Sequence, residues 1–277
     1  MGLTHWRAHR EDRGVTVRRG LDRNPLYAAA DPPASGRFPT ARRYALRGPC
    51  PCLGRARSRL AVLWAHNSFV EFEYERALMV RDLARMGIRN ERVLAAMAKV
   101  PRERFVREQD VDVAYGDHAL AIPEGQTISQ PYVVARMTEL LAVDSTHRVL
   151  EVGTGSGYQA AVLAELARDV ITVERHAILA DRASALLTEL GYANVRVVAG
   201  DASTGYPPGA PYDRILVTAA SPGIAPELVR QCSASGLIVA PVGDQEMQHL
   251  VVRHPDGHET RHGAVKFVPL RGRAGFG

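Results

Sequence analysis

The sequence predicts an α/β protein built on a doubly wound, mostly parallel sheet, with N-terminal helices and a C-terminal antiparallel hairpin. Three observations carry this prediction. Short apolar strands alternate with amphipathic helices between residues 147 and 243, a pattern typical of a parallel sheet covered on both faces. Two helical patterns precede this region, and two apolar runs joined by Pro255-Asp256-Gly257 follow it, which indicates a hairpin.

Residues 1–66 differ in charge from the rest of the 277-residue chain. They contain 13 Arg, no Lys and 4 acidic residues (+9), whereas residues 67–277 contain 22 basic and 26 acidic residues (−4), which together give the net charge of +5. The segment has no sustained periodicity and is expected to be largely disordered. A solvated tail, or sequence ahead of the true translation start, is favoured over a nucleic-acid-binding arm, because its arginines are not regularly interleaved with aromatic residues.

Composition excludes several classes of protein. No apolar run reaches the roughly 18–20 residues that a membrane-spanning helix needs, and the N-terminus lacks the apolar region of a secretory signal. The three cysteines, Cys50, Cys52 and Cys232, are too few for a disulfide framework and lack a second pair for a zinc site. A soluble protein of the reducing cytoplasm is therefore expected.

Histidines recur every four residues at His254, His258 and His262. On a helix this spacing would align them as a metal-binding face. Pro255 and Gly257 prevent such a helix, so these histidines are expected to lie in a turn and beside strands, and no metal site is predicted.

Two helices are predicted before the sheet, over residues 73–88 and 90–100. Apolar residues recur there at helical spacing, namely Leu78, Leu83 and Met86, then Val93, Leu94 and Met97. Gly87 is the predicted C-cap of the first helix and Asn90 the predicted N-cap of the second. A further helix is expected to begin at about Pro131, after a loop, because proline suits the first helical turn.

The alternating region supplies the elements of the sheet. Strands are predicted over residues 147–153, 169–174, 195–201, 212–220 and 236–243, and helices over 158–167, 177–191 and 226–232. The closing hairpin is predicted to pair residues 248–254 with residues 263–270. Sheets of this kind bind ligands at the carboxyl ends of their strands, so the site is expected there.

The strongest local motif is "VLEVGTGSGY", residues 149–158. Its glycines fall at alternate positions, 153, 155 and 157, where a strand turns into a helix. A nicotinamide-binding turn would place its third glycine at position 158, which is occupied by Tyr158. The alternate spacing is that of methyltransferases that hold S-adenosylmethionine, although a purely structural glycine turn is an alternative.

Three acidic residues lie at the same ends of successive strands. Glu174 ends the second strand and is expected to accept hydrogen bonds from ribose hydroxyls. Asp201 ends the third strand and is expected to face an adenine amino group. Glu151 precedes the first glycine and is expected to meet the cationic amino group of a methionine moiety. Together they predict a site for S-adenosylmethionine.

With these motifs in place, the chain resembles the protein-L-isoaspartate O-methyltransferases from about Met79 to Leu270. The matching segments are "RVLAAMAKVPRERFV", "EGQTISQPYVVARMTELL", "VLEVGTGSGYQAAVLAELA", "VERHAILADRA", "LGYANVRVVAGD", "APYDRILVTAA", "PVG" and "FVPL". The most specific part is "QTISQPYVVARM". The resemblance implies an enzyme that transfers a methyl group from S-adenosylmethionine to the free carboxylate of L-isoaspartyl residues in damaged proteins and peptides. The products would be a methyl ester and S-adenosylhomocysteine.

The resemblance also assigns domains and site residues. Residues 67–277 would form the methyltransferase domain, with a helical addition and substrate loop over 71–130 and a Rossmann-like core over 131–270. The catalytic residue would be Ser129. The cofactor would contact Glu151, Gly153, Thr154, Gly155, Gly157, Glu174, Asp201 and Ala202. The substrate would contact Ile122, Gln126, Thr127, Ile128, Phe267 and Val268, the last two in a C-terminal strand "FVPL".

Some points stay open at the level of sequence. Ser129 also suits the N-cap of the helix from Pro131. The family usually has glycine where this chain has Ala202, which is expected to affect cofactor affinity. A methyltransferase acting on a small molecule or RNA is one alternative function, and a non-catalytic regulator that keeps the nucleoside pocket is another. Isoaspartyl proteins are the expected partners, and a monomer is expected.

Overall fold

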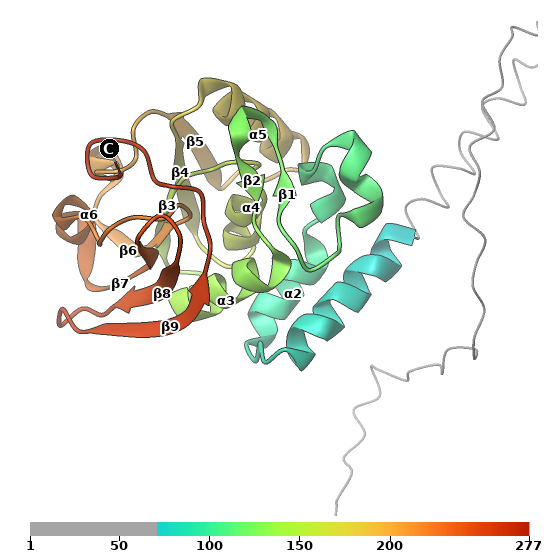
Figure 1. Cartoon of the computed structure of the whole chain (residues 1–277), viewed down its shortest axis with the longest axis horizontal. Helices are drawn as coiled ribbons and strands as arrows, with labels where there is room; N and C mark the ends of the chain where they lie inside the picture. Colours follow the sequence, from blue (N-terminus) through green and yellow to red (C-terminus); the bar gives the residue numbers. More distant parts are fainter. Residues whose placement is uncertain (1–70, 277) are drawn as a thin grey trace, which may run out of the picture. The chain divides into compact units, whose positions relative to one another are not determined.

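The structure is a computed structural model, and it describes residues 71–276. The predicted leader, residues 1–66, lies outside the described residues, as do Cys50 and Cys52. The described part contains a seven-stranded sheet in the order β5-β4-β3-β6-β7-β8-β9 and a separate two-stranded pair, β1-β2 (Figure 1). The predicted α/β class, with N-terminal helices and a C-terminal antiparallel pair, is confirmed.

Two helices precede the sheet, as predicted. The first covers residues 71–85 and the second, α2, covers Glu91–Lys99. The side chain of Asn90 accepts hydrogen bonds from the backbone N–H groups of Arg92 and Val93, so it is the N-cap of α2. Gly87 has a φ of 106° just after the first helix, as expected of a C-terminal glycine. Met86 is 43% exposed, because the helix ends one residue earlier.

The segment between α2 and the sheet is more ordered than the loop that the sequence predicts. It contains η1 (Arg102–Phe105), η2 (Glu108–Val113), β1 (Leu120–Ala121), η3 (Pro123–Gly125) and β2 (Thr127–Ile128). Strands β1 and β2 pair antiparallel, with Leu120 opposite Ile128. Helix α3 (Pro131–Leu141) then begins at the predicted proline. Because such short strands carry little periodicity, the sequence gives no sign of this hairpin.

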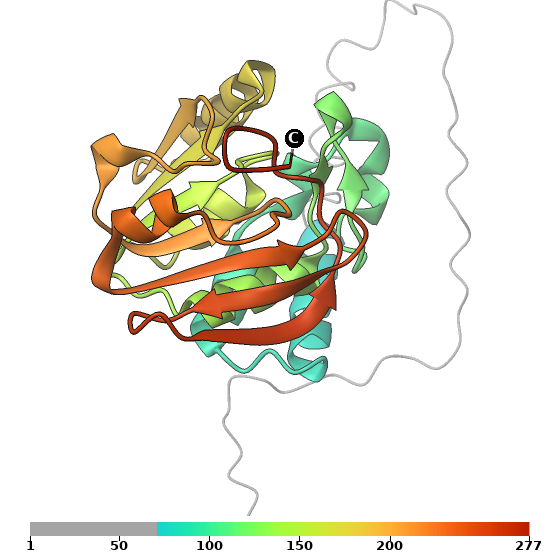
Figure 2. The same ribbon diagram turned by 60° about the vertical axis from the view of Figure 1, so that its left-hand side comes forward.

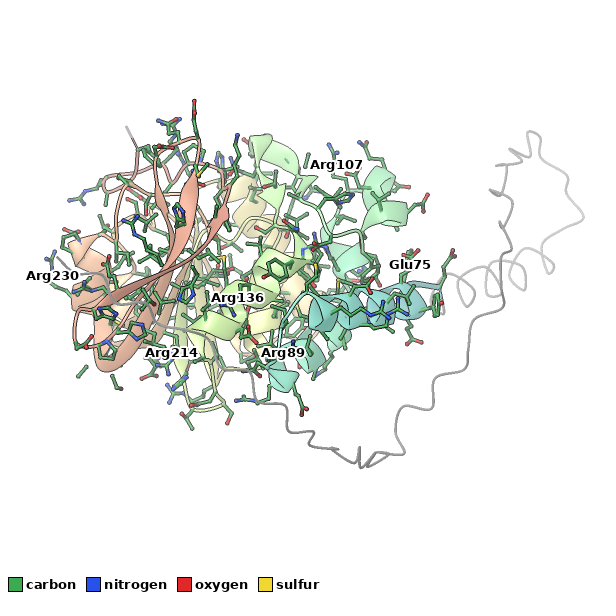
Figure 3. All side chains as sticks on the ribbon, turned by 60° about the horizontal axis from the view of Figure 1, so that its bottom comes forward. Glu75, Arg89, Arg107, Arg136, Arg214 and Arg230 are labelled. Atoms are coloured by element: carbon green, nitrogen blue, oxygen red, sulfur yellow. The ribbon has the colours of Figure 1, made fainter. Side chains whose placement is uncertain are left out.

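Glu139 of α3 ties the helices together. Its carboxylate accepts hydrogen bonds from the backbone N–H groups of Arg89 and Asn90 at 2.7 and 2.9 Å. It also pairs with Arg136 at 2.7 Å. Arg89 and Arg136, labelled in Figure 3, come from the turn before α2 and from α3. The N-terminal helical addition is thereby anchored to the core.

The core alternates strands and helices as predicted. Its elements are β3 (Arg148–Val152), α4 (Tyr158–Ala164), β4 (Asp169–Glu174), α5 (Ala177–Glu189), β5 (Val195–Ala199), η4 (Pro207–Gly209), β6 (Tyr212–Val217), α6 (Pro226–Gln231) and β7 (Cys232–Gly243). These five strands are parallel. One face packs against α2 to α5 and the other against α6 and the C-terminal segment. Burial on both faces explains why the strands are almost continuously apolar.

The hairpin of β8 (Gln248–Arg253) and β9 (Glu259–Val265) adds two antiparallel strands to β7. The predicted second strand, residues 263–270, is therefore wrong in its extent. After Val265 the chain leaves the sheet edge, as Figure 2 shows, and Pro269 bridges Ala220 beyond the end of β6. Two features end the strand here. Pro269 has no N–H to donate to a strand ladder, and the Phe267 N–H donates instead to the side chain of Gln248 at 2.8 Å.

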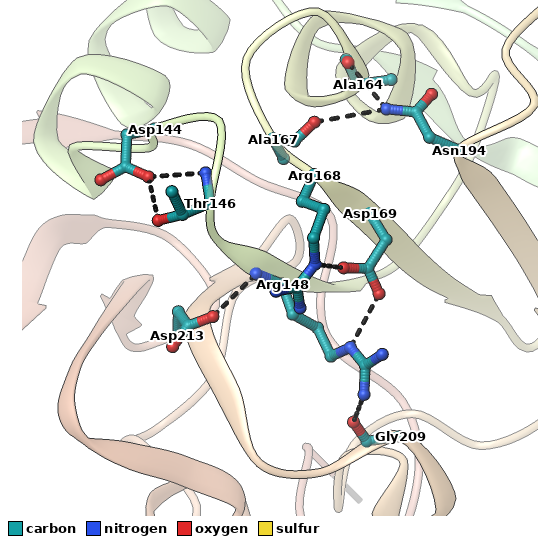
Figure 4. Close-up of polar contacts among 10 residues, drawn as sticks. All are labelled: Asp144, Thr146, Arg148, Ala164, Ala167, Arg168, Asp169, Asn194, Gly209 and Asp213. Atoms are coloured by element: carbon teal, nitrogen blue, oxygen red, sulfur yellow. Dashed lines mark hydrogen bonds and ion pairs between the residues drawn. The ribbon is translucent and has the colours of Figure 1, made fainter.

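Polar contacts fix the amino ends of the strands, on the edge opposite the expected site (Figure 4). The Arg148 guanidinium donates to Asp169 at 2.7 Å and to the Gly209 carbonyl at 3.4 Å. The backbone N–H of Arg148 donates to Asp213 at 2.8 Å. These contacts join β3, β4 and β6 near their starts and thereby hold their carboxyl ends in register.

No helix within residues 71–276 is long and apolar enough to cross a membrane. The same residues contain no group of three or more His, Cys, Asp or Glu side chains that could hold a metal ion. His254 and His258 stack with ring centroids 5.8 Å apart. His254 and His262 both lie within hydrogen-bond distance of the Thr260 hydroxyl. These histidines sit at the turn and flank of the β8–β9 hairpin.

Candidate active site

A pocket with an empty volume of about 910 Å³, open mouth included, lies at the carboxyl ends of the strands. It is lined by the ends of β3, β4 and β6, the β2 segment and the C-terminal segment. The sequence-predicted residues that line it are Gln126, Thr127, Ile128, Ser129, Glu151, Gly153, Thr154, Gly155, Glu174, Ala202, Phe267 and Val268. The predicted residues Ile122, Gly157 and Asp201 do not line it.

The glycine turn connects β3 to α4 with positive φ angles of 97° at Gly153 and 89° at Gly157, a conformation that side chains disfavour. A Cβ on Gly153 would lie 2.6 Å from the Thr218 hydroxyl oxygen, and one on Gly157 would lie 3.3 Å from Ala183 of α5. Packing within the protein therefore requires these two glycines. Of the three glycines in the turn, Gly153 and Gly155 line the pocket and Gly157 does not.

Glu151 is a buried carboxyl group without a partner. The residue is 0% exposed, and neither carboxyl oxygen has a hydrogen-bond partner among the described residues. Burial raises the pKa of Glu151 to about 8; the nearby Thr172 hydroxyl opposes this rise, and the charge of Glu174 adds to it. A buried carboxylate without a partner is costly, so this group is suited to meet a cation that enters the pocket.

Glu174 fixes the glycine turn from the neighbouring strand. Its Oε2 accepts hydrogen bonds from the backbone N–H groups of Thr154 and Gly155 at 3.1 and 2.9 Å. Its Oε1 accepts one from the His176 N–H at 2.9 Å. Because each carboxylate oxygen has two lone pairs, Oε1 can accept one more hydrogen bond from a donor in the pocket. Glu174 thus both shapes the turn and faces the pocket.

Ser129 lies between β2 and α3 and lines the pocket. The N-cap of α3 is Gln130, with no side-chain capping bond, so the alternative that Ser129 caps this helix is wrong. Within residues 71–276 the Ser129 hydroxyl makes no hydrogen bond, whereas its backbone carbonyl accepts one from Arg102 at 2.8 Å. The hydroxyl is therefore available to a bound molecule.

Asp201 serves a different part of the structure. Its two carboxylate oxygens accept hydrogen bonds from the backbone N–H groups of Ser203 at 2.9 Å and Arg273 at 3.1 Å. Burial opposes ionisation of this group, but these hydrogen bonds lower its pKa below the ordinary value. Asp201 thereby holds the C-terminal segment, and the adjacent Ala202 lines the pocket instead.

Ile122 and Gln248 support the site from outside the pocket. The Ile122 side chain covers the outer side of Gly155, where a Cβ would lie 3.7 Å from its Cδ1 atom. Gln248 is completely buried and positions Phe267 through the hydrogen bond to its backbone N–H.

Sequence reasoning missed several residues that line the pocket, among them Met137, Tyr158, Gln159, Arg175, His176, Thr218, Ala219 and Arg271. Thr218 follows β6 directly, and its hydroxyl lies 2.9 and 2.6 Å from the carbonyl oxygens of Val152 and Gly153. The rule that sites form at the ends of parallel strands would have found it. His176 faces Glu124 at the hairpin tip, 3.6 Å away, a contact without a local sequence signal.

Comparison with known proteins adds independent findings. A family model described as "Protein-L-isoaspartate(D-aspartate) O-methyltransferase (PCMT)" matches residues 74–275. A protein-L-isoaspartate O-methyltransferase of Methanoculleus marisnigri is 54% identical over 206 residues, covering 73% of this chain and 94% of the relative. One from Koribacter versatilis is 50% identical over 209 residues, covering 74% and 94%.

Solved structures agree with these relatives. A protein-L-isoaspartate O-methyltransferase structure is 26% identical with a TM-score of 0.66, covering 72% of this chain and 67% of the other. A Plasmodium falciparum protein described by the same activity, in complex with S-adenosyl-L-homocysteine, is 22% identical with a TM-score of 0.62, covering 71% and 98%. The second likeness shows the fold alone.

Proposed function

The chain belongs to the protein-L-isoaspartate(D-aspartate) O-methyltransferase family, and from this premise we propose how its pocket carries out the repair reaction. The protein is a methyltransferase that esterifies the free carboxylate of L-isoaspartyl residues in damaged proteins and peptides. One observation carries the assignment of the site. Ser129 and Glu151 line the same pocket as the glycine turn, and among residues 71–276 neither the Ser129 hydroxyl nor the Glu151 carboxyl group has a hydrogen-bond partner.

The residues of the pocket fit S-adenosylmethionine, which supplies an electrophilic methyl group on a cationic sulfonium when bound. Glu151 would hold the cationic amino group of the methionine moiety, because that contact relieves the cost of its buried charge. Glu174 would accept a ribose hydroxyl through Oε1. Ala202 would lie against the adenine ring. Asp201 would contribute through the C-terminal segment that it holds.

Ser129 is the proposed catalytic residue. A carboxylate with an ordinary pKa near 4 is already ionised at neutral pH, so the nucleophile needs no general base. The Ser129 hydroxyl would donate a hydrogen bond to one oxygen of the substrate carboxylate and aim the other at the methyl group. Such orientation contributes up to roughly 7–11 kcal/mol in well-positioned reactions.

Apolar residues around Ser129 would exclude water from the reaction. Ile128 is 2% exposed, and Phe267 and Val268 line the same pocket. Opposite charges neutralise each other as the methyl group is transferred, so a site without water favours the reaction. We propose that Gln126, Thr127, Ile128, Phe267 and Val268 contact the peptide around its isoaspartyl residue.

The experiment that tests this function offers S-adenosylmethionine with a tritiated methyl group to two matched peptides. One contains isoaspartate and the other contains aspartate at the same position. We expect base-labile label in the isoaspartyl peptide only, because a methyl ester is hydrolysed by base. Label in both peptides, or label only in small metabolites or RNA from an extract, would contradict the assignment.

We further propose that residues 67–277 form the catalytic domain and act as a monomer in the cytoplasm. The proposed mechanism assigns roles only to pocket residues of a single chain and none to a second copy. Within residues 71–276, Cys232 is free, as expected of a thiol in a reducing compartment. The partners of the enzyme are isoaspartyl proteins, and the proposed mechanism requires no metal ion.

A further inference from the structure

Arg102, at the start of η1, is a buried cation. It is 0% exposed and forms no salt bridge within residues 71–276. Its Nε donates a hydrogen bond to the carbonyl of Ala114 at 2.8 Å, and its Nη2 donates one to the carbonyl of Ser129 at 2.8 Å. Its Nη1 has no partner among the described residues.

The same guanidinium lies over an aromatic ring directly after the glycine turn. Its central carbon is 4.8 Å from the centroid of the Tyr158 ring. Tyr158 is the first residue of α4, is 1% exposed and lines the pocket. Arg102 therefore touches three segments at once, namely the residue after η2, the segment that carries Ser129 and the start of the helix after the glycine turn.

A role in filling space does not explain this residue. A buried charge without a counter-ion is costly, and an apolar side chain of similar size would fill the same volume without that cost. An apolar side chain would, however, leave the carbonyls of Ala114 and Ser129 without their donor. The two hydrogen bonds to main-chain carbonyls are thus the specific contribution of Arg102.

We propose that Arg102 is a positioning residue for methyl transfer. It holds the main-chain carbonyl of Ser129 against the first turn of α4 and so fixes the direction of the Ser129 hydroxyl relative to the cofactor pocket. Because the bond is to the carbonyl of Ser129 itself, the peptide group after Ser129 cannot rotate without losing it. The inference rests on the proposed function, since it takes Ser129 as the catalytic residue.

The test compares Arg102→Lys and Arg102→Met with the control Arg104→Lys in the full chain. A lysine ammonium keeps the charge but lacks the planar fork that reaches both carbonyls. Arg104 lies two residues away, is largely exposed and pairs with Glu189 at 2.7 Å, a contact that lysine can keep. The readouts are kcat and KM with an isoaspartyl peptide, the Kd of S-adenosylhomocysteine by calorimetry, and the Tm.

We expect Arg102→Lys to lower kcat by about tenfold or more, because a misplacement of about 1 Å can cost roughly 10²-fold. The Kd of S-adenosylhomocysteine should stay within about twofold of the wild-type value, since no contact to the cofactor is removed. Arg104→Lys should leave kcat unchanged.

A double-mutant cycle with Ser129→Ala separates positioning from general support of the fold. If Arg102 acts through Ser129, the effect of Arg102→Lys on kcat should shrink to about twofold or less when the hydroxyl is already absent, because the two changes affect one interaction. A residue that merely supports the fold would give the same loss of kcat in both backgrounds.

Three results would overturn the proposal. They are an additive cycle, a Kd that weakens in proportion to kcat, and loss of cooperative unfolding in both Arg102 variants, which would show that the fold itself depends on this residue. These results are distinct from failure of the proposed function. That failure would appear as a wild-type protein that transfers no methyl group to the isoaspartyl peptide.

Discussion

At the scale of single residues, Glu151 has the most unusual environment in the pocket. Its carboxyl group is removed from water and has no hydrogen-bond partner within the described residues. Its pKa of about 8 means that the free protein holds it largely neutral at pH 7. A cation bound beside it would favour the ionised form. Cofactor binding and proton release are therefore expected to be coupled.

The first prediction concerns the pH dependence of this coupling. Because the complex needs ionised Glu151, the Kd of S-adenosylhomocysteine should fall as pH rises from 6 toward 7.5, by up to about tenfold per pH unit. Calorimetry in buffers of different ionisation enthalpy should show about one proton released per ligand at pH 6.5. Glu151→Gln should bind more weakly and lose the pH dependence. An unchanged slope in Glu151→Gln would refute the coupling.

The raised pKa of Glu151 also makes the free energy of unfolding depend on pH. The folded protein keeps the proton on Glu151 up to about pH 8, whereas the unfolded chain loses it near the ordinary value of 4.5. The folded state thus binds more protons between these pH values, so this group makes the free energy of unfolding fall as pH rises. Urea unfolding at pH 5 and pH 8 should show a smaller fall in Glu151→Gln than in the wild type.

The second prediction concerns Ser129. Ser129→Ala should lower kcat on an isoaspartyl peptide at least about tenfold, because the substrate carboxylate loses a charge-assisted hydrogen bond. The Kd of S-adenosylhomocysteine should change little. Steady-state kinetics and calorimetry on the same preparation measure both quantities. Wild-type turnover in the variant would remove Ser129 from the mechanism.

The sequence predicts the position of a site residue when that residue lies near the carboxyl end of a predicted strand. Glu151 is the second-last residue of β3 and Glu174 is the last residue of the adjacent parallel strand β4, so the sequence predicts that both lie at the same edge of the sheet. Asp201 lies two residues beyond the next strand, β5, and its carboxylate accepts a hydrogen bond from the Arg273 N–H, 72 positions away in the chain. Arg102 and Ser129 meet across 27 positions. No local pattern reports either of these contacts.

At the scale of elements, the glycine turn and α5 pack closely enough to exclude a side chain. Gly157 combines a φ of 89° with an ideal Cβ position 3.3 Å from Ala183 and 3.4 Å from Leu187 of α5. The turn to which we assign cofactor binding is therefore also packed against the hydrophobic core. A substitution at Gly157 is therefore expected to change both the packing against α5 and the shape of the turn.

The third prediction follows from this packing. Gly157→Ala should lower the free energy of unfolding of the ligand-free protein by about 1–3 kcal/mol, through backbone strain and crowding against α5. Gly263→Ala in β9 is the matched control, because nothing lies within 4 Å of its Cβ position and its φ is not positive. Urea unfolding curves give both values. Equal stability of the two variants would contradict this explanation.

The fourth prediction concerns the C-terminal segment. The backbone N–H of Arg273 is bound by Asp201 and that of Ala274 by Ser203. Asp201→Ala should therefore speed hydrogen exchange in peptides covering residues 271–276 about tenfold or more, because local opening loses its restraint. Mass spectrometry of exchange measures this effect. Asp256→Ala in the β8–β9 turn should leave that segment unchanged, and equal protection in Asp201→Ala would exclude the anchoring role.

The elements that sequence reasoning places wrongly share a physical cause. The β1–β2 pair is two residues long on each side, too short for an alternating pattern. The strand predicted over residues 263–270 ends at Val265. The residues that follow are hydrogen-bonded elsewhere, Phe267 N–H to the Gln248 side chain and Val268 and Leu270 to the backbone of Ala220. The long, periodic elements of the core are placed correctly because their burial alone sets their pattern.

At the scale of the whole molecule, the site is assembled from segments that lie far apart in the sequence. Residues 126–129, 153–156 and 267–271 all line one pocket, although more than a hundred positions separate the first from the last. Parallel pairing brings the strand ends to one edge, and the contacts around Arg148 fix the opposite edge. The fold class therefore determines where the chemistry takes place.

The fifth prediction concerns the leader. The family model begins at residue 74, and among residues 71–276 those that line the pocket begin at Gln126. A chain lacking residues 1–66 should keep kcat and KM within about twofold of the full-length values, as expected for changes remote from the site. Kinetics on an isoaspartyl peptide test this expectation. A loss of turnover would show that the leader takes part in catalysis.

In the proposed mechanism, the Ser129 hydroxyl and the cofactor bound at the glycine turn both contact the free carboxylate of the substrate. A crystal structure with S-adenosylhomocysteine and an isoaspartyl peptide would show whether they do. We predict that the free carboxylate of the peptide lies about 2.6–3.0 Å from the Ser129 hydroxyl, on the sulfur side of the cofactor, with the amino group of the cofactor bound to Glu151. A carboxylate bound away from Ser129, or a cofactor whose sulfur faces another part of the pocket, would contradict the account.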